Sequence, residues 1–599
     1  MTTTVTEEPE PMEGLASTPS GHPLPTAWER ARQRFDGSAR AGWAATIGIT
    51  ALAFLLRLWH LSTPKVFAFD ETYYAKDAWA LSKFGYARNF IEGADDNILA
   101  GRLTGQFADG PSMIVHPDVG KWIISVGIKL FGMDPFGWRI ASVVVGSLLV
   151  LLTIRFVRRV SGSMLLGIIG GILVTFDGLA FVLSRLALLD LFVAFFLLLA
   201  VHLMVMDRDW CRRRFAALVP AQLSEPGAWG PVRRLLFRPW LLCSGIAWGL
   251  AIGCKWEALY PLAAFGLLYV AWSAGMRRSF GVRLSWLRAC VADGPTAFVH
   301  LVGVALAVYV MTWIPWMAHA DVYEESLSAT QYTRYTGEGH CEDKSYVPDN
   351  LNEKRWPTAT EPDASGFGEA TQSLRSLWYY HRDVYTFHTH FLECAEHTYG
   401  SHPAGWLLLN RPVGVAADTG ILSGEKSRGE RCEATPKTDP DGAGSQEAGT
   451  CLRQVLLLGT PVLWWGAFLA LIVSAFMWVA ARDWRFGVAV VGVLSTWLPW
   501  LQYAGRPIFS FYMIIALPFL VLGLCLCLGK LLDRPPSRAG APPGAPGTPG
   551  IRRRFGGAIA VGIFVALVVC NFAWFWPIYT DEMLTRQDWL TRIWFKRWI

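Results

Sequence analysis

Two adjacent carboxylates, Asp70 and Glu71, stand just beyond the first apolar segment, in the run FAFDETYYAKDAW. A positioned carboxylate can accept the proton of a reacting hydroxyl group as a general base. A solvated loop can carry the same pair, and spacing alone does not separate the two interpretations. Aromatic neighbours that can stack on a sugar, the nearby membrane surface and a helix start that favours an acid all point to chemistry. The pair is therefore our candidate for a catalytic base.

Charged residues near or inside apolar segments form the second group of candidates. An ionisable group at membrane depth costs about 2.5–3.5 kcal/mol on insertion scales, so such groups usually pair or mark a functional site. Any one of them can instead be a snorkelling side chain at the interface. As a set they fit a shared anionic ligand such as a lipid phosphate, and the set comprises Arg139, Asp177, Arg185, Asp190, Lys255, Glu257 and Arg506. The polar run VHPDVGK adds His116 and Lys121.

The histidine-rich segment at 381–402 raises the question of a metal. H-x-H and E-x-x-x-H spacings occur at His388/His390 and Glu393/His397, but the zinc motif HExxH is absent and aromatic residues crowd the segment. Packing and substrate hydrogen bonding explain these histidines better. No cofactor is firmly implied, and a divalent metal is compatible with the sequence but not predicted.

The composition indicates a membrane protein. Hydrophobic residues make up 52% of 599 residues, with 29 tryptophans and a mean hydropathy of +0.30. The apolar residues gather in runs of about 20, the length that spans a bilayer. We predict eleven transmembrane helices, near 43–61, 138–156, 163–183, 186–206, 240–256, 258–275, 297–318, 456–481, 486–503, 508–530 and 556–576.

The basic residues decide the orientation, because loops rich in Lys and Arg face the cytoplasm. Segment 118–131 either spans the membrane or lies in the interface. Only the second solution puts the Arg-rich loops between 155 and 288 on the same side as the N-terminus. We therefore expect a cytoplasmic N-terminus, and 118–131 as an amphipathic juxtamembrane helix on the outer face. The net charge of +6 lies in these short loops, so it is a topology signal and predicts no nucleic-acid partner.

This topology divides the chain into four parts. They are a disordered cytoplasmic N-terminus (1–40), an N-terminal transmembrane region (41–318) with a catalytic first outer loop (62–137), a long extracytoplasmic loop (319–455) with a flexible tip near 423–450, and a C-terminal transmembrane region (456–599) with a cytoplasmic Pro/Gly linker (531–555). Four cysteines share the long outer loop, and proximity favours Cys341–Cys394 and Cys432–Cys451 among three pairings.

Several motifs, in order along the chain, resemble the protein O-mannosyltransferases, membrane glycosyltransferases of the GT-C fold class. The matching segments are FDE at 69–71, HPDVGK at 116–121 (HPPLGK in the family), WRIAS at 138–142, FDGLAFVLSRLALLD at 176–190, GCKWEALY at 253–260, YHRDVYTFHTH and HTYGSHPAGWLLLNRP between 380 and 412, and RPIFSFYMIIALPF at 506–519. The outer loop has no room for the β-trefoil MIR domain of the eukaryotic enzymes, so the chain looks like the bacterial, actinobacterial form.

The resemblance implies a multi-pass enzyme of the cell membrane whose active site is extracytoplasmic. Such an enzyme would transfer mannose from a polyprenyl-phosphate carrier to Ser or Thr of a protein during or after translocation, by direct displacement with inversion. We expect Asp70 to be the base, with Glu71 orienting the loop or the acceptor. The candidate phosphate ligands are Arg139, Arg185, Lys255 and Arg506, and His388, Trp406 and Arg411 would line the acceptor or sugar pocket. His116, Lys121 and Asp190 complete the candidate substrate-binding set.

Two alternatives remain at this point. Another GT-C transferase could modify a lipid or polysaccharide with a different sugar. A secondary transporter also fits the apolar segments, but it predicts internal repeats and broken helices at the midplane. This chain instead places its charges toward one face and has long outer loops.

Overall fold

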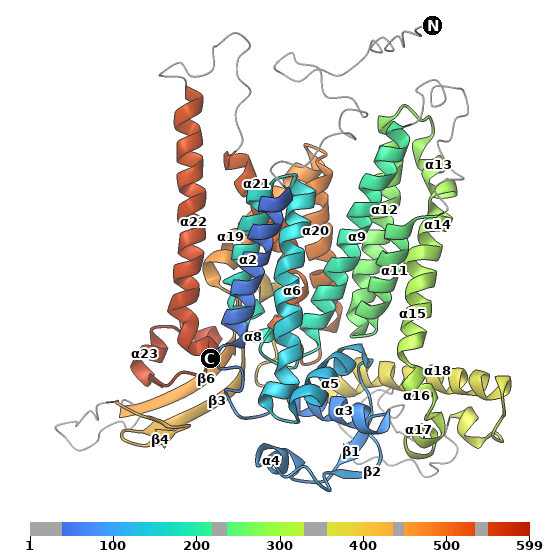
Figure 1. Cartoon of the computed structure of the whole chain (residues 1–599), viewed down its shortest axis with the longest axis vertical. Coiled ribbons are helices and arrows are strands. Elements are labelled where there is room, and N and C mark those ends of the chain that lie inside the picture. The colour runs from blue at the N-terminus through green and yellow to red at the C-terminus, as the bar shows by residue number, and fades with distance from the viewer. Residues whose placement is uncertain (1–38, 218–236, 329–355, 435–448, 533–548) are drawn as a thin grey trace, which may run out of the picture.

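The computed structural model describes residues 39–217, 237–328, 356–434, 449–532 and 549–599, and it is dominated by a bundle of upright helices (Figure 1). Eight helical segments are long and apolar enough to cross a membrane: α2 (Ala39–Leu58), α6 (Pro135–Ser161), α9 (Asp190–Ala216), η2–α12 (Trp256–Ser279), α14–η3–α15 (Gly294–Thr312), α19 (Pro461–Val479), α20–η10 (Trp484–Tyr503) and most of α22 (Pro549–Tyr579). Three shorter apolar helices accompany them: α7 (Met164–Thr175), α11 (Pro239–Ile252) and α21 (Leu517–Leu532). Each predicted apolar run coincides with one of these segments, and the all-α membrane fold is confirmed.

Capping residues set the ends of the helices, and the apolar side chains of each helix determine whether it lies inside the bundle or on its surface. In α6, the Asp134 side chain accepts a hydrogen bond from the Gly137 N–H at 2.8 Å, Pro135 occupies the first turn, and Gly162 ends the helix with φ +77°. Helix α9 is largely buried in the centre, whereas α2 and α22 expose Leu55 and Ile563 and similar side chains. Apolar side chains on the outside of a bundle suit contact with lipid.

The first predicted loop forms a compact layer at the lower end of the bundle (Figure 1). Its elements are α3 (Glu71–Phe84), β1 (Arg88–Phe90), α4 (Ala94–Leu99), β2 (Phe107–Pro111) and α5 (Val119–Phe131), with β1 and β2 antiparallel. Helix α5 packs against α3 and α6. It lies at this end beside α3, as the interfacial interpretation of 118–131 predicts.

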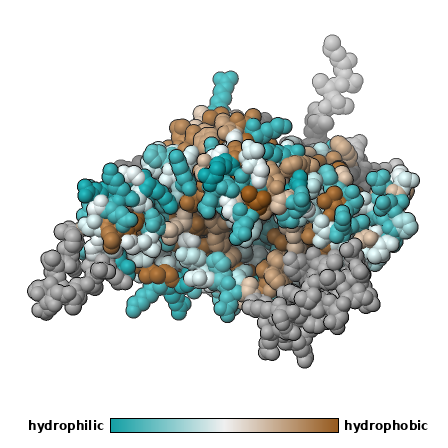
Figure 2. All heavy atoms as spheres, turned by 90° about the horizontal axis from the view of Figure 1, so that it is seen from below, coloured by the Kyte–Doolittle hydropathy of each residue, from teal (hydrophilic) through white to brown (hydrophobic). Residues whose placement is uncertain are grey.

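The second long loop lies at the same end (Figure 1). It contains α16 (Ile314–Met317), α17 (Ala320–Leu327), η6 (Pro357–Thr360), α18 (Phe367–Thr389), η7 (Phe391–Cys394) and η8 (Pro403–Leu408). Seen from below, this face is largely hydrophilic, with hydrophobic residues gathered near its middle and along one edge (Figure 2).

A small sheet completes the lower layer, and the sequence analysis did not predict it. Strand β3 (Val413–Leu422) pairs antiparallel with β6 (Thr450–Leu457), which also pairs with β7 (Leu584–Thr585). The predicted flexible tip is partly ordered, because β4 (Lys426–Ser427) and β5 (Glu430–Arg431) form a hairpin within it. The predicted disulfide Cys432–Cys451 is present, whereas the predicted pair Cys341–Cys394 lies outside the described residues.

Of the remaining elements, two lie between longer helices and two follow α22. They are α8 (Gly178–Leu183), α13 (Ser285–Ala292), α23 (Arg586–Leu590) and η12 (Lys596–Trp598). The predicted linker at 531–555 is helical at both ends, since α21 continues to Leu532 and α22 begins at Pro549. The predicted disordered segment 1–40 falls almost wholly outside the described residues, which begin at 39.

Candidate functional site

A cavity of about 860 Å³ lies at the lower end of the bundle where the two long loops meet the helices. Its walls come from α3, the segment before α5, the α11–α12 junction, the end of α18 and the segment around η10 and η11 (Ser510–Ile515). Six predicted site residues from distant parts of the sequence line it: Asp70, His116, Lys121, Lys255, His388 and Arg506.

Asp70 is the carboxylate of the acidic pair that faces this cavity. It precedes the first residue of α3, and the Tyr74 hydroxyl, one helical turn on, donates to its Oδ2 at 3.3 Å. Burial raises the pKa of Asp70 to about 6, and the nearby Lys255 ammonium opposes that rise. A carboxylate with a pKa close to neutral is suited to accept a proton near the working pH.

The backbone just before Asp70 is held in an unusual conformation. Phe69 has φ +54°, in the left-handed region that residues other than glycine rarely adopt. Its ring meets Phe509, Phe511 and His397 edge-on, with ring centroids 5.1, 5.7 and 5.6 Å away. Such strain persists where surrounding contacts enforce it and is common at functional sites. These contacts fix the backbone before Asp70 and therefore the direction in which the Asp70 side chain points.

Glu71 points away from the cavity and forms a buried ion pair with Arg139 of α6. Arg139 Nε and Nη2 donate to the two carboxylate oxygens at 2.8 and 2.7 Å, and both side chains are fully buried. The N–H groups of Ala68 and Ala187 also donate to Glu71, each at 2.9 Å. The remaining Arg139 donors reach the carbonyls of the preceding loop, at Leu61, Pro64 and Val66.

These contacts correct two of the sequence-based assignments. Arg139 has no donor left for a phosphate, because protein oxygens accept from all of its nitrogens. Glu71 accepts four hydrogen bonds, so its carboxylate has no capacity left for a substrate. The pair instead clamps the loop that carries Asp70 to α6 and to the segment before α9, which agrees with the loop-orienting role considered for Glu71.

Lys255 supplies one positive charge to the cavity wall. Its Nζ lies 2.9 Å from Asp190 Oδ1 and 4.5 Å from the centre of the Tyr512 ring. Asp190 begins α9 and pairs with Lys255 without being among the cavity-lining residues. The pairing raises the pKa of Lys255, so the ammonium stays charged.

Arg506 supplies a second charge and is positioned by a histidine. The His388 Nε2–H donates to the Val115 carbonyl at 3.0 Å, which leaves Nδ1 as an acceptor for Arg506 Nη1 at 3.2 Å. Arg506 Nη1 also donates to the His388 carbonyl at 3.1 Å. Burial and the Arg506 charge lower the pKa of His388 to about 4, so a neutral ring fits this arrangement. The His116 ring stacks on His388, with centroids 5.2 Å apart.

A third cation, Lys121, is neutralised by two acids. Its Nζ lies 3.0 Å from Asp77 Oδ2 and 3.3 Å from Asp118 Oδ1. Asp118 stands where the family motif has proline, and the structure uses it within this buried triad. Burial raises the pKa of Asp118 to about 6. The triad ties α5 to α3 at the cavity wall.

Three further predicted residues, like Glu71, Arg139 and Asp190, do not line the cavity. Arg185 donates to the carbonyls of Trp59 and His60, so it closes the end of α2, away from the cavity lining. Arg411 donates to the Thr398 carbonyl at 2.7 Å and to an oxygen of Ile599. Trp406 is buried behind the wall, where its Nε1 donates to Ser401 Oγ at 2.8 Å. These contacts make all three supports of the surrounding loops.

Polar residues outside the predicted site set complete the cavity, and of these the sequence had indicated only Tyr74, as an aromatic neighbour of the acidic pair. Tyr74 and Asp77 line it with Asp70, and Tyr512 lies under Lys255. The first two were detectable, because positions four and seven residues after Asp70 fall on the same face of a helix. Among the described residues, no group of three or more His, Cys, Asp or Glu side chains is arranged to hold a metal ion.

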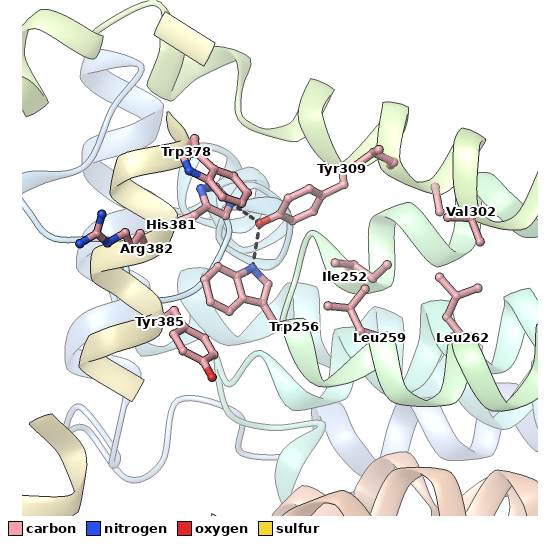
Figure 3. Close-up of a pocket in the computed structure, with 12 residues that line it drawn as sticks. Ile252, Trp256, Leu259, Leu262, Val302, Tyr309, Trp378, His381, Arg382 and Tyr385 are labelled. Carbon is pink, nitrogen blue, oxygen red and sulfur yellow. Dashed lines mark hydrogen bonds between the residues drawn. The ribbon is translucent and has the colours of Figure 1, made fainter. Parts of the chain in front are cut away.

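A second cavity of about 540 Å³ adjoins the first and is almost wholly apolar (Figure 3). The two share Trp256, Leu259 and Tyr385. Three of its polar side chains are paired with one another, since Tyr309 Oη accepts from Trp256 Nε1 at 2.8 Å and lies 2.6 Å from His381 Nε2. The reactive groups therefore belong to the larger cavity.

Comparison with known proteins gives consistent matches along the chain. Residues 47–324 match the family described as dolichyl-phosphate-mannose-protein mannosyltransferase, and 373–598 match the C-terminal four TMM region of protein-O-mannosyltransferase. The chain is 33% identical over 565 residues to a polyprenol-phosphate-mannose–protein mannosyltransferase of Mycobacterium tuberculosis, covering 93% of this chain and 92% of the relative. It is 27% identical over 534 residues to the protein of that name from Corynebacterium glutamicum, covering 88% of each.

A solved structure shares the fold. It is the Saccharomyces cerevisiae protein O-mannosyltransferase Pmt1–Pmt2 complex bound to the sugar donor, with a TM-score of 0.61 and 14% identity over 99% of this chain and 97% of that one. At this identity the likeness concerns the fold alone.

We predict that the Glu71–Arg139 clamp is essential for stability. Glu71→Gln or Arg139→Met leaves one charged partner buried without its counter-ion, which typically costs about 3–5 kcal/mol. Each single variant should therefore show a large drop in Tm in detergent. The exposed pair Arg375–Glu361 provides the control, since Arg375→Ala should leave Tm almost unchanged. Single clamp variants that melt like the wild type would contradict the assignment.

Proposed function

This chain belongs to the protein O-mannosyltransferase family, and we propose that it transfers a mannosyl residue from polyprenyl phosphate mannose to Ser and Thr hydroxyls, with Asp70 as the base. The protein is a multi-pass membrane glycosyltransferase of the GT-C fold class. Membership in this family decides against a secondary transporter and against a transferase that acts on lipid or polysaccharide. What we propose beyond the activity of the family is the role of each residue in the cavity.

One observation carries these roles: a partly desolvated carboxylate and two cations line the same cavity. Asp70, Lys255 and Arg506 come from segments far apart in sequence, yet they face one space of about 860 Å³ at the membrane boundary. A base for a hydroxyl group and cations for a phosphate are the two requirements of this transfer.

The proposed reaction is a single displacement at the anomeric carbon. The acceptor hydroxyl gives its proton to Asp70 while its oxygen bonds to C1 of the mannosyl residue. The bond between C1 and the phosphate oxygen breaks, and its electron pair stays with the polyprenyl phosphate. Saturation of Glu71 by four hydrogen bonds removes the adjacent carboxylate as a nucleophile. One substitution at C1 inverts its configuration.

The cations act on the leaving group. A phosphate diester carries one negative charge, and the monoester that leaves gains more as the C1–oxygen bond breaks. Lys255 and Arg506 would stabilise that developing charge in a site with little water, where such contacts are strongest. Neutral His388 orients the Arg506 guanidinium without repelling it. A strong general acid is unnecessary, because phosphate is stable as an anion.

We place this cavity on the extracytoplasmic face. Basic residues gather at the opposite end of the bundle: Arg155, Arg158 and Arg159 of α6, Arg212–Arg214 of α9, and Arg277 and Arg278 of α12 (Figure 1). Cytoplasmic loops carry such an excess. The Cys432–Cys451 disulfide is on the cavity side, and disulfides persist in oxidising compartments.

Orientation can be tested by labelling cysteines in intact cells. A cysteine introduced at the exposed Lys426 should react with a membrane-impermeant maleimide from outside, because β4 lies on the cavity side. A cysteine at exposed Arg278, at the other end of the bundle, should react only after the cells are permeabilised. Labelling of Arg278→Cys from outside would reverse the proposed orientation.

The base can be tested with Asp70→Asn. The amide keeps the size of the side chain but cannot accept the hydroxyl proton, so turnover should fall by about 10²–10⁴-fold. Donor binding should change little, because the cations that bind phosphate remain. The assay uses purified enzyme, polyprenyl phosphate mannose and a Ser/Thr peptide. Near-normal turnover by a folded Asp70→Asn protein would make the carboxylate structural.

The wild-type enzyme should lose activity in mild acid. Asp70 must be ionised to accept a proton and its pKa is about 6, so kcat should fall roughly tenfold for each pH unit below that value. The charged and titratable groups near Asp70 are Lys255, Asp190 and Tyr74. Asp118 has a similar pKa, so Asp118→Asn is the matched control and should keep the acid limb. A pH-independent rate between pH 5 and 7 would contradict this role for Asp70.

Arg506 should matter mainly for the donor. Arg506→Ala removes a charge-assisted contact to phosphate, so the KM for polyprenyl phosphate mannose should rise by about 10–100-fold. Arg506→Lys keeps the charge but loses the geometry that His388 positions, and recovery should be partial. The KM for the peptide should stay the same. An unchanged donor KM in Arg506→Ala would remove this residue from the phosphate site.

A further inference from the structure

Glu257 is a half-buried acid in the catalytic cavity that the mechanism above does not use. It lies in η2 (Trp256–Ala258), between α11 and α12, and lines the same cavity as Asp70 and Arg506. Both of its carboxyl oxygens are buried, and neither has a hydrogen-bond partner in the described part of the chain. Glu71, by comparison, has both oxygens saturated by protein donors.

An unsatisfied buried carboxyl group is costly, which argues against a purely structural role. Desolvation is unfavourable unless hydrogen bonds replace the lost water. The start of α12 favours a negative charge nearby, but it leaves the two oxygens without donors. An ionisable residue kept at the membrane boundary despite this cost is most simply explained by a ligand.

Most protein groups around Glu257 have other partners, although Arg506 Nε has none among the described residues. Lys255 pairs with Asp190 at 2.9 Å, and Arg506 donates to His388. The hydroxyls of Tyr260 and Tyr503, also in the cavity wall, lie 2.7 Å apart and bond to each other. A ligand that enters the cavity can supply the hydrogen-bond donors that Glu257 lacks.

The substrates differ in what they can offer a carboxylate. A carboxylate only accepts hydrogen bonds, so its complement is a group with several donors. The phosphate diester of the donor has no hydrogen to donate. The acceptor hydroxyl must give its proton to Asp70. The sugar alone presents adjacent hydroxyls that can reach two oxygens at once.

We propose that Glu257 is a sugar-recognition residue whose two carboxyl oxygens accept hydrogen bonds from neighbouring hydroxyls of the mannosyl residue. This inference rests on the proposed function, because it assumes that the cavity binds the mannosylated lipid. It has one consequence for selectivity. Glu257 contacts the sugar, so it favours the donor over the spent carrier, which has no sugar.

Binding measurements with two ligands test the assignment. Glu257→Ala should weaken binding of polyprenyl phosphate mannose by about 10–100-fold, the range for hydrogen bonds to a charged group. Binding of polyprenyl phosphate, which lacks the sugar, should not weaken. Glu325→Ala is the matched control, since Glu325 is an exposed acid on α17. Equal losses for both ligands, or no loss for either, would overturn the proposal.

Deoxygenated donors provide the second test. With the wild type, removing either of two adjacent sugar hydroxyls should weaken binding, and with Glu257→Ala those same removals should have no further effect. Equal sensitivity of the two proteins at every hydroxyl would overturn the contact. If Glu257→Ala does not fold, as judged by Tm, Glu257→Gln replaces it, with a selective loss for the mannosylated ligand expected. Because these tests measure binding, they are separate from the transfer assay, whose failure would count against the proposed function itself.

Discussion

The buried ion pair between Glu71 and Arg139 is the interaction on which the site depends. Arg139 reaches from α6 to three carbonyls of the loop after α2, and Glu71 joins that loop to the segment before α9. Taking two charges out of water is expensive, and only complete hydrogen bonding offsets the cost. That saturation makes the loop rigid. Asp70, the residue before Glu71, is thereby held at the cavity wall, where the Tyr74 hydroxyl donates to its carboxylate.

A second constraint is the balance of charge around the cavity. Lys255 and Lys121 are neutralised by Asp190 and by the acids Asp77 and Asp118. Arg506 instead faces a neutral imidazole. The positive charge of a guanidinium beside a neutral partner is not offset by a nearby carboxylate. It therefore attracts an incoming anion more strongly than an ammonium paired with a carboxylate does. The three cations therefore differ in how far nearby acids offset their charge, and Arg506 is the best suited of them to bind phosphate.

The apolar surroundings of the site complete this arrangement. Aromatic rings from both long loops and from η11 enclose the start of α3, with Phe69 in contact with Phe509, Phe511 and His397. They keep Asp70 partly desolvated, which raises its pKa toward neutrality. They also exclude water, which would compete with the acceptor hydroxyl for the mannosyl residue. The same aromatic packing therefore raises the pKa of Asp70 and favours the acceptor hydroxyl over water.

The sequence by itself determined the membrane class, the positions of the apolar helices, the acidic pair and, through the order of its motifs, the family. These features depend on local composition and spacing. It also contained the stripe Asp70, Tyr74 and Asp77, which helical periodicity places on one face. The tertiary structure decided which acid is free and which cations reach the cavity. Neighbouring residues at a helix start point about 100° apart, so Asp70 and Glu71 meet different surroundings. Arg139 lies 68 residues from Glu71, and the choice of such a distant partner depends on how the helices pack.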